Sequence, residues 1–440
     1  MKRILCINPW IHDFTAFDLW LKPLGLLSIA SLLRRKGYDV SLLDCMDGHD
    51  PSMPLPKKSS GSRLLHEFGC GYYWTEIISK PPISQTVPRY WKRFGLPYET
   101  VKSRLQKFPT PDGIFLTTVM TYWYPGAKEM LDLCRQIWPG IPVILGGIYG
   151  TICPEHARKQ GFDQVVSGTD PIQVSRQLEA ILGNTLEVKN LADYFSIYPS
   201  FDLYPEVPYA VILTSLGCPF RCSYCVSGSL YPHYFQREPR QVFSELRHDV
   251  EVLEVRDIAF YDDALLFQAE RGFLPLLRLI REAAFPVRFH LPNSLHARYV
   301  TFEIAQLMKQ CHFSTLRISL ETVSQELQRM TGGKVGRKNF EQAIHNFLEA
   351  GFLPEEIEIY LLFGFPGARK EDYLESIDYV KNMGLKPRLS LYSPIPGTSD
   401  YQKLPWLDLT SDPLLHNKIV YLYHSGQNDL YEFLQKRGQG

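Results

Sequence analysis

The stretch Gly217-Cys-Pro-Phe-Arg-Cys-Ser-Tyr-Cys-Val226 follows directly on a short apolar run. Its cysteines, Cys218, Cys222 and Cys225, have the spacing C-x3-C-x2-C and supply three thiolates, not four. A cubane iron–sulfur cluster held by three protein thiolates keeps one iron open to an outside ligand. A structural zinc site normally closes its shell with four protein ligands, and His233 is the nearest candidate for the fourth. The spacing therefore favours a 4Fe–4S cluster over a zinc site or a chance grouping.

The composition of the 440 residues is that of an ordinary globular protein, with 45% hydrophobic and 21% charged residues. The formal net charge is zero, so no bulk field favours nucleic acid or an anionic membrane. No apolar run reaches the ~18 residues of a membrane span, and the first apolar run is a β-strand, not a signal sequence. Nine cysteines, only three of them clustered, indicate a reducing compartment, and we expect a cytoplasmic protein.

Residues 1–185 alternate short apolar strands with amphipathic helices. The predicted strands are Arg3 to Ile7, Val40 to Leu43, Ile114 to Val119, Val143 to Leu145 and Gln164 to Val166, and the predicted helices are Leu24 to Arg35, Ala127 to Ile137, Pro154 to Gln160 and Ile172 to Leu182. This alternation predicts an α/β fold with a doubly wound, Rossmann-like parallel sheet. Ligands bind such sheets at the carboxyl ends of the strands, here Asn8-Pro9, Thr117-Thr118 and Gly146-Gly147, although a Gly-Gly pair is also found in ordinary turns.

Two stretches near this domain lack periodicity. Residues 46–108 carry several prolines and the run Ser59 to Ser62, and they are predicted to form an irregular surface insertion. Within it, the basic and aromatic segment Arg89 to Phe94 is either a cap over the ligand-binding edge or a solvated loop with one buried aromatic residue. Residues 186–207 are predicted to be an inter-domain linker.

A second alternation covers residues 208–400, and residues 401–440 form a short extension. The predicted strands are Tyr209 to Leu213, Ile258 to Tyr261, Val287 to Leu291, Thr315 to Leu320, Ile357 to Leu362 and Arg388 to Leu391, and the predicted helices are Arg240 to Leu253, Phe273 to Ala283, Phe302 to Gln310, Asn339 to Ala350 and Lys370 to Met383. Six units are too few for the closed eight-unit (β/α) barrel. Chemistry in such barrels lies at the carboxyl ends of the strands.

Polar residues follow several of these strands. They are Asp262, Asp263, Asn293, His296, Arg298, Ser319, Glu321 and the turn Arg329 to Lys334. Each also has a structural interpretation. One of the two aspartates can cap a helix, the histidine can be a satisfied core residue, Glu321 can be a buried structural carboxylate, and the glycine-rich basic turn either binds an anion or only reverses the chain.

The cysteine motif resembles the signature of the radical S-adenosylmethionine (SAM) family, including an aromatic residue, Tyr224, before the last cysteine. The core of that family is a six-unit partial (β/α) barrel of TIM type, and the resemblance implies this fold for the six units of residues 208–400. The resemblance implies a 4Fe–4S cluster on the three cysteines, whose open iron binds the amino and carboxylate groups of SAM. It implies cleavage of SAM to a deoxyadenosyl radical, with electrons from a donor such as flavodoxin or ferredoxin. The residues expected to contact SAM are Tyr224, Asp262, Asp263, Asn293, Arg298, Ser319, Glu321, Phe365 and Pro366.

A doubly wound domain in front of such a core resembles the cobalamin-binding domain of cobalamin-dependent radical SAM enzymes. Pro23-Leu-Gly-Leu-Leu at the first helix and Gly146-Gly147 followed by Tyr149 match those domains. No Asp-x-His-x-x-Gly motif is present, so no histidine is placed to ligate cobalt, and Ser167 to Asp170 stands where relatives often carry Gly-Glu-Gly-Glu. The residues expected to contact cobalamin are Asn8, Pro9, Leu24, Gly25, Thr117, Thr118, Gly146, Gly147, Tyr149 and Gly168.

The leading interpretation is a radical SAM enzyme that functionalises an unactivated carbon of a small or lipid-like molecule by cobalamin-dependent methyl transfer. One alternative is a corrin-free enzyme that catalyses carbon–carbon coupling or rearrangement. Another is a non-catalytic iron–sulfur electron-transfer or sensing module, against which the acids at the strand ends argue. The residues after 400 are too few for the RNA-binding barrel of tRNA methylthiotransferases, so we expect no nucleic-acid partner.

Overall fold

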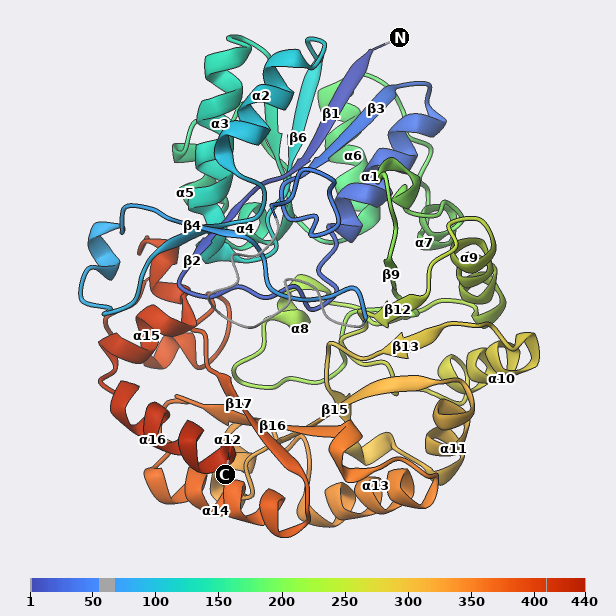
Figure 1. Ribbon diagram of the computed structural model, residues 1–440, viewed down its shortest axis with the longest axis vertical. Helices are drawn as coiled ribbons and strands as arrows, with labels where there is room; N and C mark the ends of the chain where they lie inside the picture. The colour runs from blue at the N-terminus through green and yellow to red at the C-terminus, as the bar shows by residue number, and fades with distance from the viewer. Residues whose placement is uncertain (1, 55–67, 409, 440) are drawn as a thin grey trace. The chain divides into compact units, whose positions relative to one another are not determined.

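The structure, a computed structural model, describes residues 2–54, 68–408 and 410–439. The chain divides into two compact units (Figure 1). The N-terminal unit comprises Met1–Tyr209 and Leu409–Leu415, and the C-terminal unit comprises Ala210–Asp408 and His416–Gly440. The predicted extension 401–440 therefore contributes to both units, and Tyr124 of the N-terminal unit donates a hydrogen bond to Asp412 (3.0 Å).

The N-terminal unit contains a five-stranded parallel sheet in the order β3-β1-β6-β7-β8 (Figure 1). Its strands are β1 (Arg3–Asn8), β3 (Asp39–Asp44), β6 (Gly113–Leu116), β7 (Val143–Leu145) and β8 (Gln164–Val165). Its main helices are α1 (Leu24–Arg35), α2 (Tyr98–Lys107), α3 (Tyr124–Ile137), α4 (Gly147–Ile152), α5 (Pro154–Lys159) and α6 (Pro171–Leu182). Alternate residues of β1 enter opposite cores, since Leu5 and Ile7 pack with α2 and α3 while Ile4 and Cys6 pack with α1 and α6. This two-sided burial confirms the predicted doubly wound fold.

The strand predicted over Ile114 to Val119 ends earlier than expected, at Leu116. Leu116 pairs with Leu145, and the chain after Leu145 turns into α4. Residues beyond Leu116 consequently have no neighbouring strand on that side, and Thr117 and Thr118 lie in a loop at the edge of the sheet.

The predicted irregular insertion is partly regular, which corrects the prediction. Its segment β5 (Lys92–Phe94) is the centre of an antiparallel sheet with β2 (Ile11–Asp13) and β4 (Thr75–Ile77), and α2 follows. Trp91 is buried with its ring 4.9 Å from that of Phe14, while Tyr90 is exposed. The run Ser59 to Ser62 lies outside the described residues.

The predicted linker 186–207 is also packed, not free. It contains α7 (Leu191–Phe195), and Leu186 and Val188 belong to the hydrophobic core beside α1 and α6. Phe201 is fully buried, and the Tyr204 hydroxyl donates a hydrogen bond to Asp44 (2.5 Å). These residues are therefore part of the N-terminal unit.

The C-terminal unit contains a parallel sheet whose main path is β17-β16-β15-β13-β12-β9. The strands are β9 (Tyr209–Ile212), β12 (Asp257–Phe260), β13 (Arg288–His290), β15 (Phe313–Glu321), β16 (Ile357–Phe363) and β17 (Lys386–Leu391), with β14 (Leu295–His296) paired to β15. The helices between them are α9 (Pro239–Glu251), α10 (Phe273–Ala283), α11 (Phe302–Gln310), α13 (Arg337–Glu349) and α14 (Lys370–Asn382). In the described chain β9 and β17 do not pair, so the barrel is open, as predicted.

Short elements complete this unit. They are β10 (Ser215–Leu216), β11 (Phe235–Gln236), α8 (Ser227–Leu230), α12 (Gln325–Met330), α15 (Lys418–His424) and α16 (Asn428–Gln439). Among the described residues of the whole chain, no helix is both long and apolar enough to cross a bilayer.

Candidate active site

The cysteine loop connects β10 to α8 at the carboxyl edge of the open barrel. Cys218 and Cys222 are half-buried and Cys225 is exposed. Burial raises the pKa of Cys218 to about 11 and also raises that of Cys222, and each thiol is further affected by the charge of Cys225. Across the described residues, no group of three His, Cys, Asp or Glu side chains could hold a single metal ion. A zinc site places its ligands around one ion, whereas a cluster attaches its thiolates to separate irons.

A glycine starts the loop because no other residue fits there. Gly217 has φ +79°, and a Cβ atom added to it would lie 2.8 Å from Cβ of Tyr231. The resulting sharp turn directs the chain from β10 into the cysteines. Cys225 then closes a turn by donating its backbone N–H to the carbonyl of Cys222 (3.1 Å).

A buried polar network occupies the ends of β14 and β15 beside this loop. Lys334 donates hydrogen bonds to Oγ of Ser319 (2.7 Å) and to Oε1 of Glu321 (3.2 Å), and Ser319 also bonds to Ser294. Burial opposes the charge of Lys334, but the carboxylate of Glu321 and the thiol of Cys222 raise the pKa of the lysine above its ordinary value. A cation is thus held at the strand ends, next to the proposed cluster ligands.

Two observations indicate that this network is built to contact a ligand. Glu321 has φ +65°, a left-handed conformation that is costly for a non-glycine residue and that concentrates at functional sites. Both ring nitrogens of His296 are buried without a hydrogen-bond partner. Burial, together with Lys334 and Arg298, lowers the pKa of His296 to about 3, so its imidazole is neutral. Because buried polar atoms are rarely unpaired, these groups fit a polar cosubstrate such as SAM.

Three of the residues predicted to contact SAM make hydrogen bonds within the protein. Asp262 is buried and accepts hydrogen bonds from the backbone and side chain of Thr214 and from Ser215, while burial raises its pKa. Asn293 donates to the carbonyl of Tyr261 (2.9 Å). Each of these bonds joins the ends of neighbouring strands.

Arg298 has a similar supporting position. Its guanidinium donates to the carbonyls of Gly333 (3.0 Å) and Lys334 (3.2 Å) and so fixes the turn that carries Lys334. Asp263, by contrast, is exposed, and its charge is close enough to raise the pKa of the Cys218 thiol. Of the predicted acidic pair, Asp263 is the member that remains available to a cation.

The turn after β16 contributes an apolar side to the site. Phe365 is buried and its ring centroid lies 6.3 Å from that of Tyr392, and Pro366 is half-buried. Lys334 and His296 were noted in the sequence but were not assigned to SAM. The signal that could have singled out Lys334 was its position after two glycines in a turn near the end of β15.

At the strand ends of the N-terminal unit, unlike those of the barrel, the polar side chains are largely paired with one another. The order of strands reverses direction at β1, so the switch point lies between the carboxyl ends of β1 and β6, at Asn8 and Thr117. Asn8 is buried and donates to Asp44 (2.7 Å), which also accepts from Tyr204. Burial raises the pKa of Asp44. Polar side chains at this edge are thus largely paired with one another.

Backbone is accessible at two of the predicted cobalamin contacts. A Cβ added at Gly25 would meet no atom within 4 Å, and one added at Gly146 would come no closer than 3.9 Å, to the carbonyl of Leu116. Gly147 is different, since its φ is +85° and a Cβ there would lie 2.4 Å from the carbonyl of Thr118. Gly147 therefore lets α4 start against the loop after β6.

Other predicted cobalamin contacts are engaged in the fold. The side chain of Tyr149 is fully buried and its hydroxyl bonds to His156 (2.7 Å). Gly168 donates its backbone N–H to Thr151 (3.1 Å). Pro9 and Thr118 are buried and Leu24 begins α1.

The described histidines of this unit also have partners. His12 bonds to Glu129 (2.9 Å), His49 to the carbonyl of Gly69 (2.8 Å) and His156 to Tyr149. Each of these bonds uses one nitrogen of the imidazole ring.

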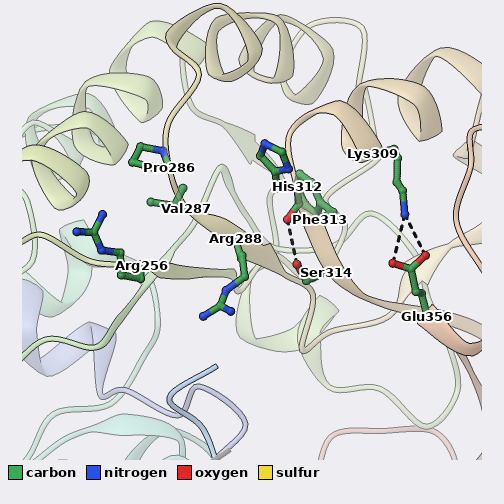
Figure 2. A pocket seen from close by; sticks show the side chains of 9 residues that line it. All are labelled: Arg256, Pro286, Val287, Arg288, Lys309, His312, Phe313, Ser314 and Glu356. Atoms are coloured by element: carbon green, nitrogen blue, oxygen red, sulfur yellow. Dashed lines mark hydrogen bonds and ion pairs between the residues drawn. The ribbon is translucent and has the colours of Figure 1, made fainter. Parts of the chain in front are cut away.

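A cavity of about 620 Å³ lies at the opposite, amino-terminal end of the barrel strands (Figure 2). Its lining includes Arg288, which pairs with Asp257, and Lys309, which pairs with Glu356 (3.0 Å). The amino-terminal face of such barrels serves stability, whereas catalysis occurs at the carboxyl face. The cavity is therefore separate from the site formed by the cysteines and Lys334.

Comparison with known protein families agrees with this geometry. The family model of the radical SAM superfamily matches residues 212–380, which contain the cysteine loop and the strand-end network. The model of the B12 binding domain matches residues 89–174, which contain Thr117, Gly146 and Gly168.

Among curated proteins, an uncharacterized methyltransferase of Pyrococcus horikoshii is 23% identical over 338 residues, which cover 69% of this chain and 71% of that protein. The bacteriochlorophyllide d C-12(1)-methyltransferase of Chlorobaculum tepidum is also 23% identical, over 60% of this chain and 59% of its own length. Among solved structures, the radical SAM methyltransferase TsrM from Kitasatospora setae superimposes with a TM-score of 0.66 at 15% identity, covering 98% of this chain and 89% of TsrM. The chain therefore contains a radical SAM domain that is preceded by a B12-binding domain.

Proposed function

We propose that this protein is a cobalamin-dependent methyltransferase that acts on an unactivated carbon of a small molecule. The observation that carries the proposal is the buried network of Lys334, Ser319 and Glu321 beside three free cysteines, in a chain that also has a B12-binding domain. An electron-transfer module needs no strained, unsatisfied polar site next to its cluster. The names of the two curated relatives and of TsrM all include methyl transfer, which supports the same reaction here.

In this proposal, different residues of the site contact the cluster and different parts of SAM. Cys218, Cys222 and Cys225 bind the cluster. The Lys334 ammonium faces the carboxylate of SAM, and the exposed Asp263 faces its amino group, because opposite charges form the stronger hydrogen bonds. Ser319, Glu321 and Tyr224 contact the ribose and methionine parts, and Phe365 and Pro366 contact the adenine.

Cobalamin is held in the N-terminal unit by backbone at Gly25 and Gly146 and by residues at the switch point, Asn8 and Thr117. When bound, the reduced cluster supplies the electron that cleaves SAM, and cobalamin carries the methyl group. The protein contributes positioning and the exclusion of water.

The substrate, electron donor and location are parts of the same proposal. A small or lipid-like substrate is consistent with the zero net charge, which gives no field for nucleic acid. The electron donor is a small redox protein of the flavodoxin or ferredoxin type. The nine cysteines are all free thiols, which supports a cytoplasmic location in a reducing environment.

The test is anaerobic reconstitution with iron, sulfide and hydroxocobalamin, followed by SAM carrying a trideuterated methyl group. Deoxyadenosine formation under reductant and label recovered in the corrin fraction are expected, with about one corrin per chain. Deoxyadenosine without corrin binding would instead support the corrin-free coupling enzyme. An intact cluster without any SAM cleavage would support the electron-transfer module.

A further inference from the structure

Ser223 lies between Cys222 and Cys225, and each of its polar groups makes a hydrogen bond within the protein. The Ser223 backbone N–H donates to the carbonyl of Thr331 (3.3 Å), and its own carbonyl accepts from the backbone N–H of Asp400 (3.1 Å) and from Oγ of Ser399 (3.2 Å). Its hydroxyl donates to Oδ2 of Asp400 (2.6 Å). A loop residue that uses every donor and acceptor in this way has little conformational freedom.

Asp400 is the centre of this contact. It is fully buried, lies 177 residues from Ser223 in the sequence, and meets that residue through both its backbone and its side chain. Its second carboxylate oxygen accepts a hydrogen bond from Lys403 (2.7 Å). The carboxylate is thereby fixed by a cation on one side and directs its other oxygen at the cysteine loop.

We infer that Asp400 is a positioning residue that holds the cysteine loop in the conformation that binds the cluster, an inference that rests on the proposed function. Cys222 and Cys225 flank Ser223 and Tyr224, so movement of Ser223 displaces two of the three thiolates. A preformed set of ligands binds metal more tightly because the ordering of the loop is already complete. Groups that orient metal ligands from outside the ligand set typically contribute 10- to 100-fold in affinity.

The experiment compares the full-length holoprotein with Asp400→Ala, Asp400→Asn, Ser223→Ala and the double variant Asp400→Ala/Ser223→Ala. The rate at which a ferrous-iron chelator removes iron from the reduced cluster is measured, and the paramagnetic resonance spectrum of that cluster is recorded. Asp400→Ala and Ser223→Ala are expected to lose iron about tenfold faster. The double variant should lose iron no faster than the faster of the two single variants, because both single substitutions remove the same contact between Ser223 and Asp400. Asp400→Asn keeps an acceptor for the Ser223 hydroxyl and should restore most of the slow rate.

Asp372→Ala is the matched control. Asp372 is a second buried aspartate of the same unit that accepts from the N–H of Arg369 at the start of α14, so its loss weakens the fold away from the cysteines. If it released iron as fast as Asp400→Ala at equal thermal stability, the effect would be general and the inference would be wrong. Should Asp400→Ala fail to fold, Ser223→Ala, which deletes a single hydroxyl, carries the test. An unchanged rate and spectrum in Ser223→Ala would overturn the inference, whereas a wild-type protein that binds no cluster would overturn the proposed function.

Discussion

The carboxyl edges of the two parallel sheets differ in how their buried polar groups are paired. At the edge of the C-terminal unit, His296 presents buried ring nitrogens without partners, and Glu321 adopts a strained backbone conformation. At the edge of the N-terminal unit, Asn8 is bonded to Asp44 and the accessible groups are glycine backbone. The first edge is suited to a small, charged ligand recognised by side chains. The second is suited to a large ligand recognised by shape.

The largest effect in this comparison is expected from removal of the cysteines. The triple variant Cys218→Ala/Cys222→Ala/Cys225→Ala should lose the brown absorbance and SAM cleavage almost completely, because these three thiolates are the proposed ligands of the cluster. Cobalamin uptake should persist, since the N-terminal unit folds around its own core. Iron and sulfide analysis and equilibrium dialysis measure the two properties. Retention of a full complement of iron would point to other cysteines as the ligands.

The second largest effect is expected at Lys334. Lys334→Met should weaken SAM binding by about 10- to 100-fold, the loss of one or two charge-assisted hydrogen bonds. Lys338→Met, an exposed lysine on the neighbouring helix α13, is the control and should bind SAM normally. Equilibrium dialysis with labelled SAM gives both values.

Lys334→Met also leaves Glu321 buried without its cation, so a second variant is needed. Lys334→Met/Glu321→Gln removes that unpaired charge and should remain defective in SAM binding. Recovery of normal affinity in the double variant would mean that Lys334 only neutralises Glu321 and does not contact SAM.

Gly146 and Gly147 are neighbours in the sequence, but their substitution is expected to affect different properties of the N-terminal unit. The first substitution tests cobalamin binding and the second tests folding. Gly146→Ala should change stability by less than about 0.5 kcal/mol, because the added Cβ has space, yet it should weaken cobalamin binding. Gly147→Ala should destabilise the unit by roughly 1–3 kcal/mol or more, because φ is +85° and the Cβ would contact the carbonyl of Thr118. Urea unfolding measures the stability of each variant, and equilibrium dialysis measures its cobalamin binding. Normal corrin binding by Gly146→Ala would remove this glycine from the proposed site.

The smallest effect concerns a buried acid that serves the fold. Burial raises the pKa of Asp18 to about 7, although hydrogen bonds from the Leu21 amide and the Tyr209 hydroxyl oppose the shift. The folded state therefore binds the proton more tightly than the unfolded state. Its contribution to stability is full below about pH 4 and falls as the pH rises toward 7, by at most roughly 1.4 kcal/mol per pH unit.

Asp18→Asn should flatten this pH dependence, whereas Asp39→Asn, at a largely exposed ion pair with Arg3, should not. Urea unfolding followed by tryptophan fluorescence between pH 4.5 and 7.5 is suitable, because every tryptophan except Trp406 lies in the N-terminal unit. An identical pH slope in wild type and Asp18→Asn would show that Asp18 is ionised throughout.

Local patterns in the sequence were sufficient for the regular elements and for the cluster motif. The helices Leu24–Arg35 and Phe273–Ala283 have the predicted bounds, because their apolar residues repeat at helical spacing within one continuous segment. The cysteine spacing carries its own chemical meaning, since three thiolates within eight residues need no distant partner. Strands of three residues, such as β5, are too short to show a period, and the antiparallel sheet they form was missed.

Only the tertiary structure decided which polar side chains serve the ligand and which serve the fold. Asp262 and Asp263 are adjacent in the sequence, yet the first is buried among Thr214 and Ser215 and the second is exposed. Lys334 reaches Glu321 across 13 residues, and Asp400 reaches Ser223 across 177. Such pairs form because parallel strands bring their carboxyl ends to one edge, where burial makes an unpaired polar group costly. Residue type and spacing therefore identify the elements, while partners that meet across the edge determine the role of each side chain.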